Sequence, residues 1–355
     1  MTKQISTQSP TVAVYGATGH TGGYILGELR RRAFTPILVG RNADRLRAAA
    51  EAAGLPDAEI RVADLNDHAA LVAAFTGADV VISGLAAFID FGEAVLAAAI
   101  AAGAHYTDTS GEQNFLRKVL NDYNTRAEAA GVTVVSGITD NNLSGDLLAY
   151  LTTRRVQGPA ELVISHLSLS GGHGSKGSAK TVLANLDSFR DGGFHYENGE
   201  FRTGPATRYT EMVFPGAAAP TAVGKFPQSS VLTIPRHSDV SYVAGALDAT
   251  ILGHLSGFTA EAIEAMPDTP DSDLRYYLIV DTYGADGAVV RGLLSGVDSY
   301  RDSAIMAVEV AARLGTGVAK PGALAPAEAF DPEDFLNALA PHGITFGIGE
   351  APARA

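Results

Sequence analysis

Short apolar runs alternate with amphipathic stretches over about the first 140 residues of the chain. Runs rich in β-branched residues are typical of strands buried on both faces, and the stretches between them have helical periodicity. The predicted strands are residues 11–15, 36–40, 59–65, 78–85, 105–109 and 132–138. The predicted helices between them are residues 21–32, 43–54, 67–76, 92–103 and 114–130. Strands that alternate with helices of this length predict a parallel, doubly wound α/β sheet.

The pattern changes after about residue 145, where Gly, Ser and Thr become denser. Polar and apolar residues then alternate, which is typical of antiparallel strands with one solvated face. The alternating runs are residues 161–172, 229–243, 275–284 and 287–300, and helices are predicted at 178–193, 259–266, 303–315 and 332–343. The sequence therefore predicts a disordered tail at 1–10, a first α/β domain over 11–145 and a second α+β domain with a mixed or antiparallel sheet over 146–302.

The amino-acid composition limits the expected location of the protein and the classes of partner that it can bind. The chain has 355 residues, enough for two domains, and its formal net charge of −13 disfavours nucleic acid and anionic membranes as partners. It has no cysteine, which excludes disulfides and thiol chemistry. The N-terminus lacks the apolar stretch of a signal peptide, and the run of small apolar residues at 94–104 is too short to span a bilayer. We therefore expect a cytoplasmic protein without membrane insertion.

A glycine-rich loop connects the first predicted strand to the first predicted helix, and it predicts a Rossmann-type site for a dinucleotide. Gly16 allows a tight turn, Gly19 lets the backbone approach a pyrophosphate, and Gly22 lets the helix pack closely on the sheet. The helix N-terminus would offer N–H groups and positive potential to the phosphates. The alternative is a structural turn without a ligand. The candidate cofactor-binding residues of the loop are Gly16, Ala17, Thr18, Gly19, His20, Thr21 and Gly22.

The end of the second predicted strand indicates NADP(H) rather than NAD(H). NAD sites carry an acidic residue there for the ribose 2′-hydroxyl, whereas this strand is followed by Arg41, which suits a 2′-phosphate. Asn42 and Arg45 are candidates to assist, and the alternative for Arg41 is a solvated loop cation. Residues after the third strand are expected near adenine, and residues after the fourth near the nicotinamide ribose. These candidates are Asp64 and Leu65, and Ser83, Gly84 and Leu85.

Four further stretches, residues 90–112, 137–150, 168–185 and 296–314, add a family resemblance to the glycine loop. Together they resemble the saccharopine dehydrogenase-like family, which includes trans-acting enoyl reductases, and the resemblance covers about residues 11–347. Its most specific motif is Tyr106-Thr107-Asp108-Thr109-Ser110-Gly111-Glu112. The resemblance implies a homodimer, hydride transfer with a nicotinamide cofactor, an inserted domain for substrate and dimer contacts, and C-terminal helices over 303–347 that return to the Rossmann domain.

Two places in the chain are candidates for proton transfer. Tyr106 could donate a proton and Asp108 could accept or relay one, since they follow a strand end where such sheets bind ligands. The alternative is that Asp108 and Ser110 order a turn and cap the next helix. In a second glycine-rich segment, His173 could supply a proton and Lys176 could bind a substrate oxygen. The alternative there is a surface loop with solvated charges.

Other chemistries find no support in the sequence. The nine histidines form no H-E-x-x-H motif, so no metal site is expected, and there is no G-x-S-x-G motif or Tyr-x-x-x-Lys pair. The sequence therefore predicts an NADPH-dependent reductase that transfers hydride to a C=N, C=C or C=O bond of a small or lipid-like substrate. The alternative is a non-catalytic protein that senses NADPH and binds a partner.

Overall fold

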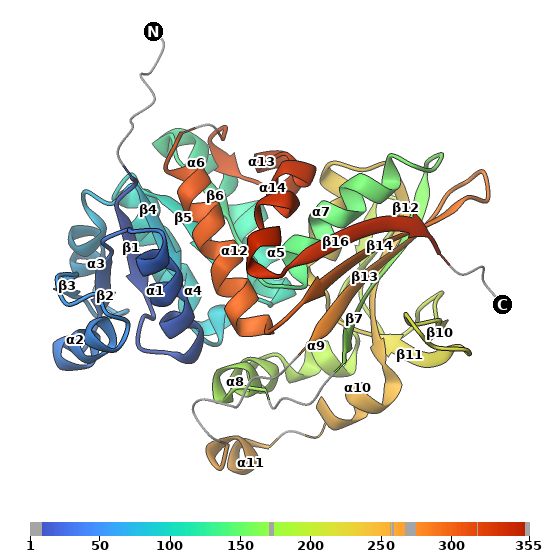
Figure 1. Ribbon diagram of the computed structural model, residues 1–355, viewed down its shortest axis with the longest axis horizontal. Helices are drawn as coiled ribbons and strands as arrows, with labels where there is room; N and C mark the ends of the chain where they lie inside the picture. Colours follow the sequence, from blue (N-terminus) through green and yellow to red (C-terminus); the bar gives the residue numbers. More distant parts are fainter. Residues whose placement is uncertain are drawn as a thin grey trace, which may run out of the picture. The chain divides into compact units, whose positions relative to one another are not determined.

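The computed structural model describes residues 9–169, 174–255, 257, 259–266, 275–317 and 319–351. The chain forms two compact units (Figure 1). The first unit contains residues 9–110, 114–139 and the described residues of 303–324. The second contains residues 111–113, the described residues of 140–302, and residues 325–351. Of the predicted tail, residues 1–8 lie outside the described residues.

The first unit is built on a seven-stranded sheet in the order β15-β6-β5-β4-β1-β2-β3, and every neighbouring pair is parallel. This confirms the predicted doubly wound parallel sheet. The central strands β1 and β4 are buried along their whole length, as their β-branched residues predict. The strands are β1 (Val12–Tyr15), β2 (Ile37–Gly40), β3 (Glu59–Val62), β4 (Val80–Ser83), β5 (His105–Asp108), β6 (Thr133–Val135) and β15 (Gly322–Ala323).

Side-chain caps set the starts of several helices between these strands. Asn42 accepts a hydrogen bond from the Arg45 N–H at the start of α2, and Asp67 accepts one from the Ala70 N–H at the start of α3. The helix predicted at 114–130 is instead two helices that meet at Tyr123, where φ is −107° and ψ is −10°. The helices are α1 (His20–Arg31), α2 (Ala43–Ala52), α3 (His68–Phe75), α4 (Phe88–Ala101), α5 (Gln113–Asp122), α6 (Asn124–Ala130) and α12 (Ser299–Leu314).

The second unit is built on a nine-stranded mixed sheet, with the main order β10-β11-β12-β7-β13-β14-β16 and with β8 and β9 beside β12. The β13–β14 hairpin is antiparallel as its alternation predicts, but β7 and β12 pair in parallel, which the sequence pattern does not distinguish. The strands are β7 (Ala160–Ser168), β8 (His195–Glu197), β9 (Glu200–Arg202), β10 (Glu211–Met212), β11 (Thr221–Lys225), β12 (Val240–Asp248), β13 (Tyr276–Tyr283), β14 (Val289–Gly296) and β16 (Thr345–Glu350).

Helix α7 (Asn142–Thr153) covers one face of this sheet at β13 and β14, and a hydrophobic cluster that includes Val163, Tyr209 and Ile279 covers part of the other. Helix α14, from the predicted C-terminal segment, packs against α7. None of the helices in the described part of the chain is long and apolar enough to span a membrane. The remaining helices are α8 (Lys176–Ala184), α9 (Leu186–Arg190), α10 (Ala249–Leu255), α11 (Ala260–Glu264), α13 (Pro326–Ala329) and α14 (Pro332–Ala338).

The predicted strand over residues 229–243 is wrong in its first half. Residues Ser229–Leu232 and Ile234–Arg236 form two short 3₁₀ turns, η1 and η2, and β12 begins only at Val240. Tertiary contacts hold this conformation: the Ser229 N–H donates to the Asn142 side chain, and the Ser229 hydroxyl donates to the Gly111 carbonyl. Pro235 also cannot donate to a strand ladder. An alternating apolar run is therefore buried here without being a strand.

Candidate functional site

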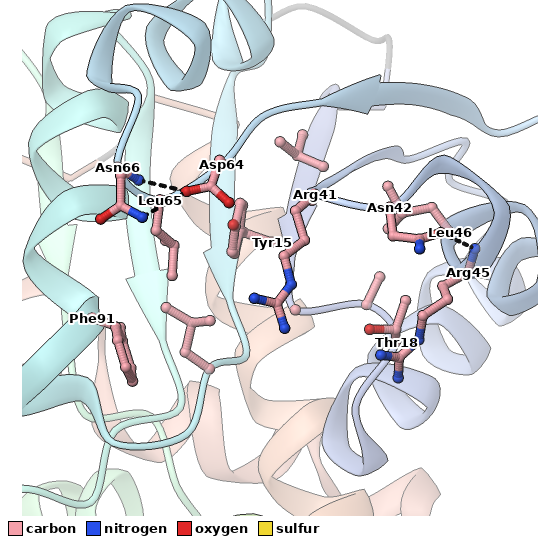
Figure 2. A pocket seen from close by; sticks show the side chains of 15 residues that line it. Tyr15, Thr18, Arg41, Asn42, Arg45, Leu46, Asp64, Leu65, Asn66 and Phe91 are labelled. Carbon is pink, nitrogen blue, oxygen red and sulfur yellow. Dashed lines mark hydrogen bonds between the residues drawn. The ribbon is translucent and has the colours of Figure 1, made fainter.

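The first unit contains a pocket of about 360 Å³ beside the glycine loop (Figure 2). Its walls come from the loop after β1, the end of β2 with the start of α2, the segment after β3, and the segment after β4. This is the edge at which the parallel strands end, where open α/β sheets bind their ligands. The predicted cofactor residues that line the pocket are Gly16, Ala17, Thr18, Arg41, Asn42, Arg45, Asp64, Leu65 and Leu85.

The glycines of the loop allow close approaches between backbone segments. Gly16 has a φ of +94°, and a Cβ atom there would lie 2.5 Å from the carbonyl oxygen of Gly84. A Cβ atom on Gly22 would lie 2.2 Å from the carbonyl oxygen of Gly16. Gly16 therefore joins β1 closely to the end of β4, and Gly22 lets α1 pack directly on the loop. Gly84 and Gly22 act as spacers behind the pocket lining.

Helix α1 begins at the loop with an end suited to an anion. Its N-cap is Gly19, which provides no side-chain cap, and its first turn contains no acidic residue. The first N–H groups of a helix have no partner within the helix, and the helix dipole adds positive potential there. This end of α1 can therefore hold a phosphate group.

Two arginines give the pocket a cationic region. The Arg41 and Arg45 side chains extend into it from the end of β2 and the first turns of α2 (Figure 2). The nearby Asp44 does not line the pocket and instead pairs with Arg47, with 3.0 Å between the Asp44 oxygen and the Arg47 nitrogen. The place that an NAD site gives to a carboxylate is therefore occupied by Arg41.

The opposite part of the pocket combines one carboxylate with apolar side chains. Asp64 accepts hydrogen bonds from the Asn66 N–H and side-chain amide, at 3.0 and 2.8 Å. These bonds, and to a lesser degree the charge of Arg41, lower the pKa of Asp64. Leu65, Leu85 and Phe91 add apolar surface, and the Phe91 ring is 47% exposed. This region suits a flat heterocycle with an amino group.

Asp108 lies at the end of β5, fully buried and outside the pocket lining. One of its carboxylate oxygens accepts hydrogen bonds from the Ser110 and Gly137 N–H groups, at 2.9 and 3.0 Å, and the other accepts one from the Ser136 hydroxyl at 2.6 Å. Burial raises the pKa of Asp108, and the hydrogen bonds oppose that effect. The carboxylate thereby ties the end of β5 to the segment that follows β6.

Tyr106, two residues earlier, is also fully buried and outside the pocket lining. Burial raises the pKa of its hydroxyl well above the usual value, and the charge of Asp108 raises it further. The nearby Ser83 hydroxyl lowers the pKa of Tyr106, although the two hydroxyls are not placed for a hydrogen bond. Among the described residues, the hydroxyls of Tyr106, Ser83 and Thr107 have no hydrogen-bond partner.

The first unit contains the segment that matches a known protein family. Residues 12–135 match the family described as "Saccharopine dehydrogenase NADP binding domain". This part of the chain is therefore similar to the NADP-binding domain of saccharopine dehydrogenases. The match spans the glycine loop, Arg41, Asp64 and the Tyr106–Asp108 region, so the matched segment contains every residue that lines the pocket.

Curated relatives match about half of the chain or less. The "Lipid droplet localized protein" of Caenorhabditis elegans is 30% identical over 189 residues, which are 49% of this chain and 44% of the relative. The "Trans-acting enoyl reductase" of Mycobacterium ulcerans is 30% identical over 164 residues, which are 44% of this chain and 39% of the relative. The chain therefore spans less than half the length of these relatives.

A solved structure extends the likeness of the fold to nearly the whole chain. The saccharopine dehydrogenase (L-Glu forming) of Saccharomyces cerevisiae superposes with a TM-score of 0.64, covering 97% of this chain and 100% of that chain. The two sequences are 15% identical, so this likeness concerns the fold alone. It agrees with a Rossmann-type first unit and a second unit built on a mixed sheet.

The other sequence-based candidates lie in the second unit or outside the described residues. Lys176 begins α8, and its ammonium lies 3.0 Å from the Glu264 carboxylate, which Lys180 also approaches to 3.4 Å. Lys176 therefore links α8 to α11. His173 lies outside the described residues. In the described chain, no group of three or more His, Cys, Asp or Glu side chains could hold a metal ion.

Six residues of the pocket lining are not among the candidates from the sequence: Tyr15, Val39, Gly40, Leu46, Asn66 and Phe91. Tyr15 ends β1, and its hydroxyl donates to the Ala63 carbonyl at 3.4 Å. Phe91 lies in the first turns of α4 with its ring half exposed. The sequence offered one signal for Phe91, an aromatic residue near the start of the helix after the fourth strand. That position faces the edge of a doubly wound sheet at which ligands bind.

Proposed function

We propose that this protein binds NADP(H) in the pocket of its first unit and transfers hydride between that cofactor and a C=N, C=C or C=O bond of a small or lipid-like substrate. The observation that carries the proposal is Arg41, which lines the pocket at the end of β2 where an NAD site has a carboxylate. The family of residues 12–135, whose description names NADP, supports it. The homodimer and the cytoplasmic location stay predictions.

The pocket residues suit the parts of NADP(H) as follows. The loop from Gly16 to Gly19 and the N-terminus of α1 would hold the pyrophosphate. Arg41 and Arg45 would bind the 2′-phosphate, since a guanidinium matches its charge and geometry. Asp64 would accept from the adenine amino group, with Leu65 beside the ring. When bound, the nicotinamide supplies or accepts the hydride.

The burial of Tyr106 and Asp108 favours a positioning role for both. The three hydrogen bonds to Asp108 hold the ends of two neighbouring strands, and its carboxylate has no exposed surface. This is the turn-ordering alternative that the sequence leaves open. Asp108 would fix the segment that follows β6, and the raised pKa of Tyr106 keeps its hydroxyl protonated.

Replacing Arg41 tests the cofactor assignment. Arg41→Ala should weaken NADPH binding by roughly 10- to 100-fold, because a charge-assisted contact to the 2′-phosphate is lost, and should change NADH binding by less than about threefold. Affinities would be measured from the fluorescence of the bound dinucleotides. Arg47→Ala is the matched control, since Arg47 pairs with Asp44 and does not line the pocket. Equal losses for NADPH and NADH would contradict the assignment.

Turnover separates the reductase from the NADPH-sensing alternative. Loss of NADPH absorbance would be followed with a panel of imines, enones and ketones, including lipid-like members. A reductase should consume NADPH with at least one class, and Arg41→Ala should lower kcat/KM with NADPH. NADPH binding without consumption across the panel would instead favour the sensor.

A further inference from the structure

The second unit has a pocket of its own, lined by residues of α9, β11 and α10. Its volume is about 240 Å³. Phe189, Pro205 and Leu252 give it apolar walls, and Lys225 and Arg190 give it two cations. None of these residues lies in the matched segment at 12–135, and none is a candidate site residue of the sequence analysis.

Lys225 is the unusual member of this lining. The residue is only 4% exposed, and its ammonium donates to the carbonyls of Gly193 and Gly204, at 2.7 and 2.6 Å. An ammonium has three N–H donors, so one donor is left over by these two bonds. In the described part of the chain Lys225 makes no ion pair, and neither does Arg190. A nearly buried cation without an anionic partner is costly, which indicates a site that an anion can complete.

The surroundings of Lys225 agree with this interpretation. Burial lowers the pKa of Lys225 to about 8, while the charge of Asp191 raises it without forming an ion pair. Gly192 has a φ of +72°, and a Cβ atom there would lie 2.7 Å from the Lys225 Cβ, so this glycine lets the lysine stem pack closely. A Cβ atom on Gly224 would lie 2.8 Å from a Leu252 methyl group, so the Leu252 side chain packs directly against β11.

We propose that this pocket binds a small monocarboxylate with an apolar tail, its carboxylate at Lys225 and Arg190 and its tail against Phe189 and Leu252. One carboxylate matches the single remaining lysine donor and the neighbouring guanidinium. The three apolar walls exclude a compact, fully hydrated anion such as inorganic phosphate, because such an anion would lose hydration there without replacement. The inference is independent of the proposed function, since it concerns a different pocket.

Calorimetric titration of the full chain with sodium octanoate at about pH 7 tests the proposal. We expect saturable binding that Leu252→Trp weakens by at least about tenfold, because the indole fills the cavity without touching the hydrogen bonds of Lys225. Arg190→Gln should weaken it by about three- to tenfold. Lys180→Gln is the matched control, since Lys180 pairs with Glu264 away from this pocket, and should stay within about twofold.

Two further measurements sharpen the test. Lys225→Met should abolish binding, and affinity for octanoate should fall from about pH 7 to about pH 9 as the free ammonium loses its proton. Thermal unfolding followed by circular dichroism is measured on each sample, so a misfolded variant is recognised. The proposal is overturned if octanoate gives no saturable heat, if Leu252→Trp and Arg190→Gln bind it as the parent does, or if inorganic phosphate binds and octanoate does not.

Discussion

Asp302, in the first turn of α12, has a fully buried carboxylate. It accepts hydrogen bonds from the Val297 N–H at 2.8 Å and the Tyr276 hydroxyl at 3.2 Å, and the Arg301 guanidinium lies 2.8 Å from its other oxygen. Burial nevertheless raises the pKa of Asp302 to about 6, and the charge of Asp140 raises it further. Burial of a single residue therefore links the stability of the second unit to pH.

Because the folded-state pKa of Asp302 is raised from 3.8 to about 6, the folded protein binds a proton more tightly than the unfolded chain. Protonation of Asp302 contributes at most about 3 kcal/mol to the free energy of unfolding. This contribution is fully present below about pH 4 and is lost as the pH rises to about 6. Urea unfolding between about pH 4 and pH 7 should show this loss in the parent and not in Asp302→Asn.

Asp57→Asn, at an exposed position in the first unit, is the control for other pH effects and should follow the parent curve. If the parent and Asp302→Asn differ by the same free energy at every pH, then Asp302 does not titrate in this window.

At the scale of elements, α1 depends on one glycine for its contact with the loop. The first turn of α1 approaches the loop so closely that a Cβ atom on Gly22 would meet the backbone of Gly16 and Ala17, at 2.2 and 2.8 Å. Backbone atoms cannot rotate away as a side chain can, so any larger residue must move the helix. The position of the helix end that faces the pocket therefore depends on Gly22.

Gly22→Ala should lower the free energy of unfolding by more than about 1 kcal/mol and weaken NADPH binding by about tenfold or more, because the helix end moves away from the loop. Urea unfolding and NADPH fluorescence measure the two effects. Gly27→Ala is the control in the same helix: its Cβ would meet nothing within 4 Å, so it should be neutral or stabilise by up to about 1 kcal/mol. Equal behaviour of the two variants would refute this account of Gly22.

At the scale of the whole molecule, the first unit is completed by residues far along the chain. Strand β15 pairs with β6, and the Ala323 N–H donates to the Asn124 side chain at 2.9 Å. Arg32 bridges Glu28, at 2.6 Å, and Glu309 of α12, at 2.5 Å. The described residues of 303–324 are therefore part of the core of this unit.

A fragment of residues 9–139 should consequently lack cooperative unfolding, because it exposes the edge of β6 and leaves the Glu28 and Arg32 charges without Glu309. Thermal unfolding followed by circular dichroism would show this. Joining residues 303–324 to the fragment through a flexible linker should restore a sigmoidal transition. A fragment of 9–139 that melts cooperatively at the temperature of the full chain would contradict this view.

The features that the sequence alone determined are those encoded by patterns of neighbouring residues. The buried strands of the first unit, the glycine loop and Arg41 are readable because strand burial, backbone turns and the residue after β2 are encoded within a few neighbouring positions. Tyr106 and Asp108 are recognisable as a motif by the same means. The hydrogen bonds that hold the Asp108 carboxylate are not readable in this way, because two of them come from Ser136 and Gly137, about 30 residues away.

Only the tertiary structure decided the rest, because those features depend on partners that are distant in sequence. Residues 229–236 alternate like a strand, yet contacts with Asn142 and Gly111 turn them into 3₁₀ helix. Strand β15 has two residues and no pattern of its own, and it exists because β6 is beside it. Lys225 looks like any other lysine in the sequence. Its burial between two backbone carbonyls is a property of the folded second unit.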